Sequence, residues 1–117
     1  MQLHGLIRLV EKPELRKTND GVSVCSFTGV FNERRKIDDK FVEDAHFLDF
    51  VIWDKAAEFV CDRFDKGDRL YVGSATPRQK KWVDSDGKKR SQIIFRINEF
   101  EKVSSPKRQE GETSEQK

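Results

Sequence analysis

The most apolar run of the chain lies at residues 47–53, and its pattern predicts a central β-strand. Successive side chains of a strand point to opposite faces of its sheet. One face would hold a core stripe of Leu48, Phe50 and Ile52. The other face would combine a charge with two large rings: Phe47, Asp49 and Trp53. A face that carries a carboxylate is not fully buried, so these rings either form a surface for flat ligands or lie under a loop or a second subunit.

Apolar alternation predicts further strands on both sides of this run. They cover residues 3–10, 15–19, 22–32, 69–75, 79–83 and 91–100. Pro13 separates the first two because proline cannot donate to a ladder, and Pro77 is expected to interrupt a later strand at an edge or a bulge. Turn signals stand at residues 19–21 and 84–87. The highly charged residues 33–43 are expected to form a mobile hairpin loop.

Residues 54–67 change from the period of a strand to that of a helix. Helical spacing relates Ala56, Phe59, Val60, Arg63 and Phe64. Asp54 is expected to be the N-cap of this helix, and Gly67 to stand just beyond its end. The apolar stripe of the helix should cap one end of a sheet.

The order of elements is three strands, one helix and two strands, with long charged hairpins. This order predicts an all-β protein with one helix, a five-stranded Greek-key OB-fold barrel whose helix lies between strands 3 and 4. An open α+β sheet is the alternative with the same elements. The break between Pro13 and Gly21 and the single helix favour the barrel.

Composition adds limits on size, location and assembly. A chain of 117 residues predicts one domain, at residues 1–103. Residues 104–117 contain no apolar side chain and are expected to form a disordered polar tail. The sequence has no membrane span and no signal-peptide pattern, which predicts a cytoplasmic protein. A hydrophobic fraction of 35% predicts a small core, for which oligomerisation is a common remedy.

The candidate ligand and catalytic residues are few. Cys25 and Cys61 form no CxxC pair, and only His4 and His46 could join them, so no zinc site is expected and the thiols should be buried and reduced. The chain has no recognisable nucleophile motif and no glycine-rich phosphate loop. We therefore expect a protein without catalysis, metal or cofactor.

Net charge is only +2, from 23 basic and 21 acidic residues, so the distribution of charge is more informative. The hairpin at residues 78–90 carries Trp82 between six cations: Arg78, Lys80, Lys81, Lys88, Lys89 and Arg90. The other charged hairpin begins with Arg34, Arg35 and Lys36. Cations bind phosphates and exposed rings stack on unpaired bases, which predicts binding of single-stranded nucleic acid. Taken singly, the hairpin could be a solvated edge and Trp82 could pack on a neighbouring strand.

With these features the chain resembles the bacterial-type single-stranded DNA-binding protein family, over residues 3–103. The matching segments are residues 13–16, Thr18, Gly21, Val24, Phe27, Asn32, 47–53, 55–58, Lys66, Gly67, 78–82 and 84–90. The resemblance implies an OB-fold and an oligomer, with a homotetramer expected and a dimer as the alternative. It implies binding of single-stranded DNA in replication, recombination and repair, without catalysis or cofactor.

The resemblance also implies which residues bind. Stacking falls to Phe47, Trp53 and Trp82. The candidates for phosphate contacts come instead from the distribution of charge, chiefly in the two basic hairpins: Arg34, Arg35, Lys36, Lys55, Arg78, Lys80, Lys81, Lys88, Lys89, Arg90 and Arg96. Asp49 lies between two of the stacking rings and is expected either to pair with a cation such as Arg96 or to weaken binding.

The chain departs from the family pattern at several positions. Arg35 and Ser91 stand where the family often has aromatic residues. Residues 104–117 lack the acidic tip with a terminal Pro-Phe that recruits replication and repair proteins, which is compatible with a phage-, plasmid- or organelle-type member. Two alternative functions stay open: an OB-fold adaptor of a replication or primosome assembly, and a binder of single-stranded RNA, because stacking does not depend on the sugar.

Overall fold

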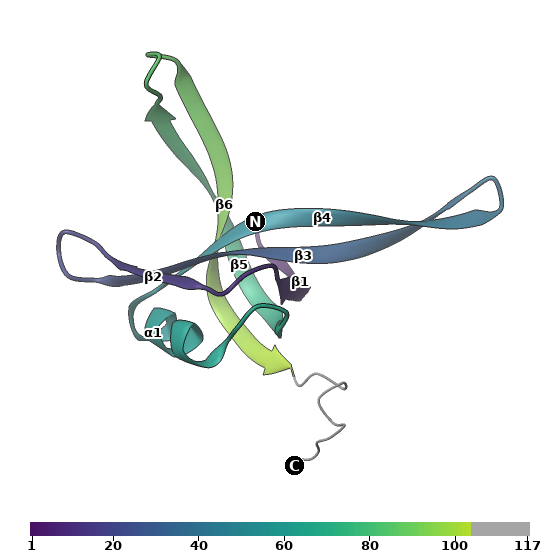
Figure 1. Cartoon of the computed structure of the whole chain (residues 1–117), viewed down its shortest axis with the longest axis horizontal. Helices are drawn as coiled ribbons and strands as arrows, with labels where there is room; N and C mark the ends of the chain where they lie inside the picture. The colour runs from purple at the N-terminus through teal and green to yellow at the C-terminus, as the bar shows by residue number, and fades with distance from the viewer. Residues whose placement is uncertain (104–117) are drawn as a thin grey trace, which may run out of the picture.

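The alternating segments form six strands, and the segment of helical period forms one helix (Figure 1). The structure is a computed structural model and describes residues 1–103. Its elements are β1 (Leu3–Leu9), β2 (Glu14–Lys17), β3 (Ser23–Ile37), β4 (Lys40–Trp53), α1 (Asp54–Arg63), β5 (Arg69–Val83) and β6 (Lys89–Val103). The predicted tail at residues 104–117 lies outside the described residues.

The strands close into a barrel. Neighbours run in the order β1-β5-β6-β4-β3, and an additional pairing of β1 with β3 completes the ring. β1 and β2 act as two halves of one strand, because both pair with β3, at residues 29–30 and 23–26 respectively. The predicted five-stranded OB-fold barrel is therefore confirmed, with α1 between its third and fourth strands, and the open α+β sheet is excluded.

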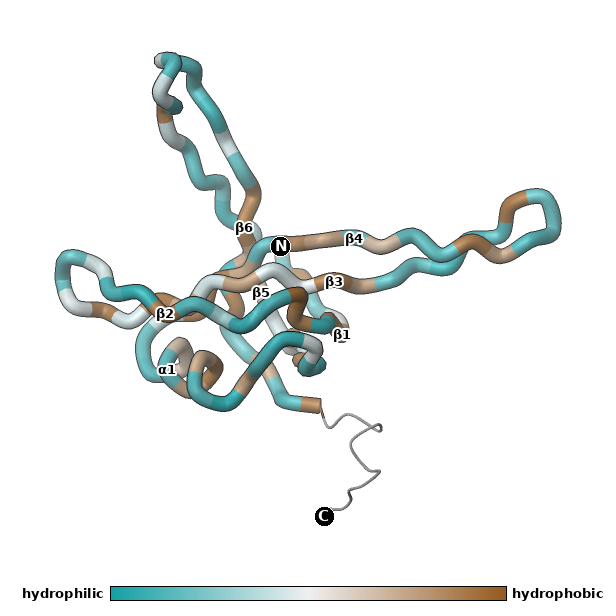
Figure 2. The backbone as a smooth tube through the Cα atoms, viewed as in Figure 1, coloured by the Kyte–Doolittle hydropathy of each residue, from teal (hydrophilic) through white to brown (hydrophobic). Residues whose placement is uncertain are grey.

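The β3–β4 hairpin extends far beyond the barrel (Figure 1). Its ladder is continuous from the Val24–Trp53 pair to the Ile37–Lys40 pair. Asp38 and Asp39 form the turn with positive φ angles of 49° and 65°, as two-residue hairpin turns require. The predicted loop at residues 33–43 is wrong, because β3 and β4 continue through it up to the turn. The side chains there are largely exposed on both faces of the hairpin, so the sequence lacks the apolar alternation that marks a strand (Figure 2).

The β5–β6 hairpin forms a second projecting arm (Figure 1). The predicted interruption at Pro77 is wrong, since the ladder runs unbroken from the Ala75–Ile97 pair to the Val83–Lys89 pair. The irregular register lies instead at residues 72–75. β1 pairs with β5 only as far as Ala75, so Pro77 lies on an edge of the sheet, as one of the two predicted placements has it. The predicted turn at residues 84–87 is confirmed by hydrogen bonds between Asp84 and Lys88.

Helix α1 covers one end of the barrel, but its limits differ from the prediction. Asp54 is the first helical residue, with a φ of 63°, and the N-cap is Trp53, which makes no side-chain capping bond. The helix ends at Arg63, so Gly67 lies in a later turn. The buried face holds Ala57, Val60 and Phe64. Phe59 was expected on that face but is 44% exposed and packs beside Phe100.

The core lies inside the barrel and under α1. Phe50 and Ile52 are each 1% exposed, and Leu48 packs against the same cluster, which confirms the inward face predicted for residues 47–53. Cys25 of β3 and Cys61 of α1 are free thiols whose Sγ atoms lie 3.0 Å apart. Burial and the neighbouring Cys61 thiol raise the pKa of Cys25. Among residues 1–103, no helix is long and apolar enough to cross a bilayer.

Candidate nucleic-acid interface

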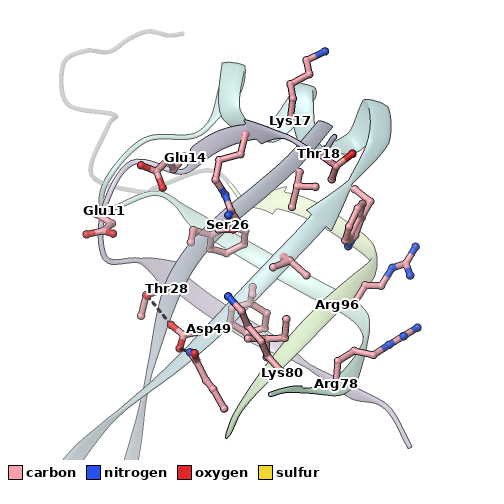
Figure 3. A pocket seen from close by; sticks show the side chains of 18 of the residues that line it. Glu11, Glu14, Lys17, Thr18, Ser26, Thr28, Asp49, Arg78, Lys80 and Arg96 are labelled. Atoms are coloured by element: carbon pink, nitrogen blue, oxygen red, sulfur yellow. Dashed lines mark hydrogen bonds between the residues drawn. The ribbon is translucent and has the colours of Figure 1, made fainter. Parts of the chain in front are cut away.

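A groove of about 800 Å³ runs over the outer face of the barrel (Figure 3). Its floor consists of the outward side chains of β3, β4 and β6, and β2 and β5 form its walls. Six basic and three acidic side chains line it: Lys12, Arg16, Lys17, Arg78, Lys80, Arg96, Glu11, Glu14 and Asp49. A cationic excess around a floor that contains the Trp53 ring suits a ligand that combines phosphates with flat rings.

Trp53 and Arg96 form the best-defined contact in this groove. Trp53 is the last residue of β4, and Arg96 of β6 belongs to one of the two register pairs that join these strands. The Arg96 guanidinium lies 5.6 Å from the centroid of the Trp53 ring, within the range of a cation–π interaction. The groove therefore combines a partly exposed ring and a positive charge at one point.

Asp49 occupies the groove floor (Figure 3). It lies two residues from Phe47 along β4, on the same face of the strand. Its Oδ1 accepts a hydrogen bond from the Thr28 hydroxyl at 2.9 Å, and its Oδ2 accepts one from the Gln92 amide at 2.5 Å. The predicted pairing with Arg96 is wrong, because Arg96 is directed toward Trp53. Neutral donors from β3 and β6 hold the carboxylate instead.

The other two predicted stacking rings lie near the groove rather than in it. Phe47 is 61% exposed and shares the outer face of β4 with Asp49 and Trp53. Trp82 is 42% exposed. The unbroken register from Ala75 to Val83 puts Trp82 on the same face of β5 as Arg78 and Lys80. The Lys80 Nζ atom lies 6.0 Å from its ring centroid.

Strand alternation divides the predicted phosphate-binding residues into two groups. Those on the same strand face as the groove rings are Arg34, Lys36, Arg78, Lys80, Arg90 and Arg96. Those on the opposite face of their hairpins are Arg35, Lys81 and Lys89. Lys88 lies in the turn, and Lys55 is exposed on α1. The structure therefore brings only part of the predicted set to the groove.

Several of these cations already have partners. Arg90 pairs with Asp84 at 2.8 Å, and Arg35 pairs with Asp44 at 2.5 Å. Lys36 lies 3.7 Å from Asp39 near the hairpin turn. These are exposed ion pairs, which contribute little and exchange readily for a phosphate.

Sequence reasoning missed two groups of groove-side residues. Arg16 and Lys17 of β2 form one wall of the groove, but two adjacent charges in a short strand are a weak signal. Phe41 lies under the Arg34 guanidinium at 4.6 Å and is 65% exposed. It precedes Phe47 by six residues and lies on the same face of β4. Strand alternation would have indicated this shared face if the predicted strand had been extended back to residue 41.

One group of potential metal ligands lies on the opposite face of the β3–β4 hairpin. The ligand atoms of Glu33, Asp44 and His46 are within 4.8 Å of one another. Glu33 contacts His46 at 3.1 Å, and Asp44 contacts Arg35. A cation at this place would have to displace Arg35, so the group acts as an exposed charge network within the hairpin.

Comparison with known proteins gives consistent matches. Residues 2–103 match the model of the Single-strand binding protein family. A single-stranded DNA-binding protein of Treponema pallidum is 34% identical over 86 residues, covering 74% of this chain and 48% of the relative. One of Borreliella burgdorferi is 31% identical over 99 residues, covering 84% and 66%. The chain thus spans about half to two thirds of the length of these relatives.

A solved structure has the same fold. It is described as a Plasmodium falciparum SSB complex with ssDNA, and it superimposes with a TM-score of 0.77. The match covers 88% of this chain and 94% of the other, at 17% identity. At that identity the likeness establishes the shared barrel architecture.

Proposed function

The chain belongs to the single-strand binding protein family, and on this basis we propose that it binds single-stranded DNA. The binding is non-catalytic and largely independent of base sequence. It coats and protects exposed strands during replication, recombination and repair. The observation that carries the proposal is the pairing of Trp53 with Arg96 inside a groove of cationic excess.

The proposed mechanism assigns separate roles to rings and charges. Bases stack on Trp53 in the groove and on Phe47 and Trp82 at its approaches, each stack contributing about 1–3 kcal/mol. Phosphates follow the cations of the two walls, Arg16 and Lys17 on β2 and Arg78 and Lys80 on β5. Stacking requires unpaired bases, which favours single strands over duplex.

The decisive experiment is a titration of tryptophan fluorescence with oligo-dT, oligo-U and duplex DNA, each at low and high salt. Strong quenching by oligo-dT, weak quenching by duplex and loss of quenching at high salt are expected. Equal or stronger quenching by oligo-U would identify an RNA binder instead. No quenching by any of the three at low salt would contradict nucleic-acid binding and favour an adaptor role. Trp53→Phe and Trp82→Phe variants assign the signal to one ring.

We propose in addition that the protein acts as a homo-oligomer in the cytoplasm, a tetramer being expected and a dimer the alternative. Leu6 of β1 is 44% exposed and lies opposite Tyr71 of β5, which is 38% exposed. Among residues 1–103, the other edge of β1 pairs with a strand only at Arg8 and Leu9. An apolar strand with a free edge favours pairing with a second copy. Light scattering coupled to gel filtration measures the mass, and Leu6→Lys should reduce it.

A further inference from the structure

Asp49 places a negative charge where the bases of a bound strand would lie. Four of the six groove cations lie on the walls, at Arg16, Lys17, Arg78 and Lys80. The phosphates would therefore lie along the walls and the bases over the floor. A carboxylate on that floor faces the edges of bases rather than the phosphate backbone. Among the ion pairs of residues 1–103, none includes Asp49.

The hydrogen bonds of Asp49 fix its orientation without saturating it. Thr28 and Gln92 each donate to a different carboxylate oxygen. A carboxylate oxygen has two lone pairs, so each keeps one acceptor position. Gln92 donates through Nε2, which leaves its own carbonyl oxygen as a further acceptor. The floor at this point is therefore held rigidly and is rich in acceptors.

The spacing along β4 suits contact with a stacked base. Residues on one strand face are separated by about 7 Å, the distance expected between Phe47 and Asp49. A base that stacks on Phe47 would then bring its edge toward the carboxylate. Phe47 is sufficiently exposed to receive it, at 61%.

We propose that Asp49 makes this groove selective for bases with an exocyclic amine over thymine. The inference rests on the proposed binding of single-stranded DNA. Cytosine, adenine and guanine can donate an amine N–H to a carboxylate, as Asp and Glu do accept from the cytosine amine. The only N–H of thymine lies between two carbonyl oxygens, which repel the carboxylate. The selectivity is thus set by an acceptor that thymine cannot approach well.

The test compares oligo-dC with oligo-dT of equal length, in mildly alkaline buffer of fixed salt concentration. The readout is the ratio of the two affinities, because loss of one negative charge alone strengthens binding of both. Asp49→Asn should lower the dC-to-dT ratio by at least ~5-fold relative to the unchanged protein. The matched control is Asp62→Asn, which removes an exposed carboxylate on α1 and should leave the ratio unchanged.

A second measurement uses the unchanged protein, so its result does not depend on whether a variant folds. Oligo-dC in which 2-pyrimidinone replaces cytosine lacks the amine, and the unchanged protein should bind it at least ~5-fold more weakly. Equal binding of these two oligonucleotides, or an unchanged ratio for Asp49→Asn, overturns the selectivity while leaving DNA binding intact. Failure of the unchanged protein to bind any oligonucleotide would instead contradict the proposed function.

Discussion

The guanidinium of Arg96 lies 5.6 Å from the centroid of the Trp53 ring, and the two side chains come from strands that pair at only two positions. The contact links the end of β4 to the middle of β6 on the groove floor. Because both side chains are half-buried, the ring is held in place while part of it stays open to a ligand.

Replacement of the Trp53 ring should weaken DNA binding without unfolding the protein. Trp53→Ala removes one stacking platform, and we expect a loss of about 1–3 kcal/mol in binding free energy. Fluorescence anisotropy with labelled oligo-dT measures the loss, and circular dichroism monitors the fold. Phe59→Ala, an exposed ring on α1 outside the groove, is the control. Unfolding of the Trp53→Ala variant would show that the ring belongs to the core.

Charge on the groove-side face of β5 should set part of the salt dependence. Lys80→Gln removes one cation of the groove wall. The negative slope of the logarithm of the binding constant against the logarithm of the salt concentration should therefore become shallower by about 0.7. Lys81→Gln removes the same charge from the opposite face of the same strand and should leave the slope nearly unchanged. Equal slopes for the two variants would argue against a defined track along this face.

Gly29 should be required for the close approach of β1 to β3. A Cβ atom at this position would lie 2.5 Å from Ile7 Cδ1 and 3.1 Å from Phe50 Cε2. Gly29→Ala should therefore lower the free energy of unfolding by about 1–3 kcal/mol, the usual cost of overpacking. Urea denaturation measures it. Gly73→Ala, where the closest atom is Glu99 Cβ at 3.3 Å, should cost less.

The turn of the β5–β6 hairpin should depend on the ionised Asp84. The hydrogen bond from Arg90, followed by those from the Lys88 and Asp86 amides, lowers the pKa of this carboxyl. A lowered folded-state pKa means that ionised Asp84 stabilises the turn above its unfolded pKa of about 3.9. That contribution is lost as the pH falls through the lower folded-state pKa. NMR titration should show a depressed Asp84 pKa, and Arg90→Gln should raise it; an unchanged pKa would contradict the contact.

The barrel could be predicted from the sequence because its elements carry strong local signals. Residues 47–53 alternate clearly, and Phe50 and Ile52 point inward as expected. The hairpin arms carry weaker signals, because a strand with water on both faces needs no apolar period. The cap of α1 was missed because Asp54 adopts a positive φ, which no local pattern indicates.

The site was predictable as a set of residue types and less so as a geometry. Phe47 and Trp53 belong to one strand, so their shared face follows from alternation. The placement of Arg34 and Arg35 on opposite faces depends on extending β3 and β4 through residues 33–43 as a hairpin. The partners of Asp49 come from β3 and β6, 21 and 43 residues away along the chain, and only tertiary structure selects Thr28 and Gln92 over a cation.

The parallel pairing of β4 with β6 has a mechanical consequence. The ladder between these two strands consists of only the Phe50–Phe95 and Val51–Arg96 pairs, whereas the antiparallel hairpins have long ladders. The groove floor crosses this ladder, so a strand lying in it would contact both sides at once. A bound strand would hold together one of the two ladders of the barrel that consist of only two register pairs. Amide hydrogen exchange near Val51 and Arg96 should therefore slow most when the groove is filled.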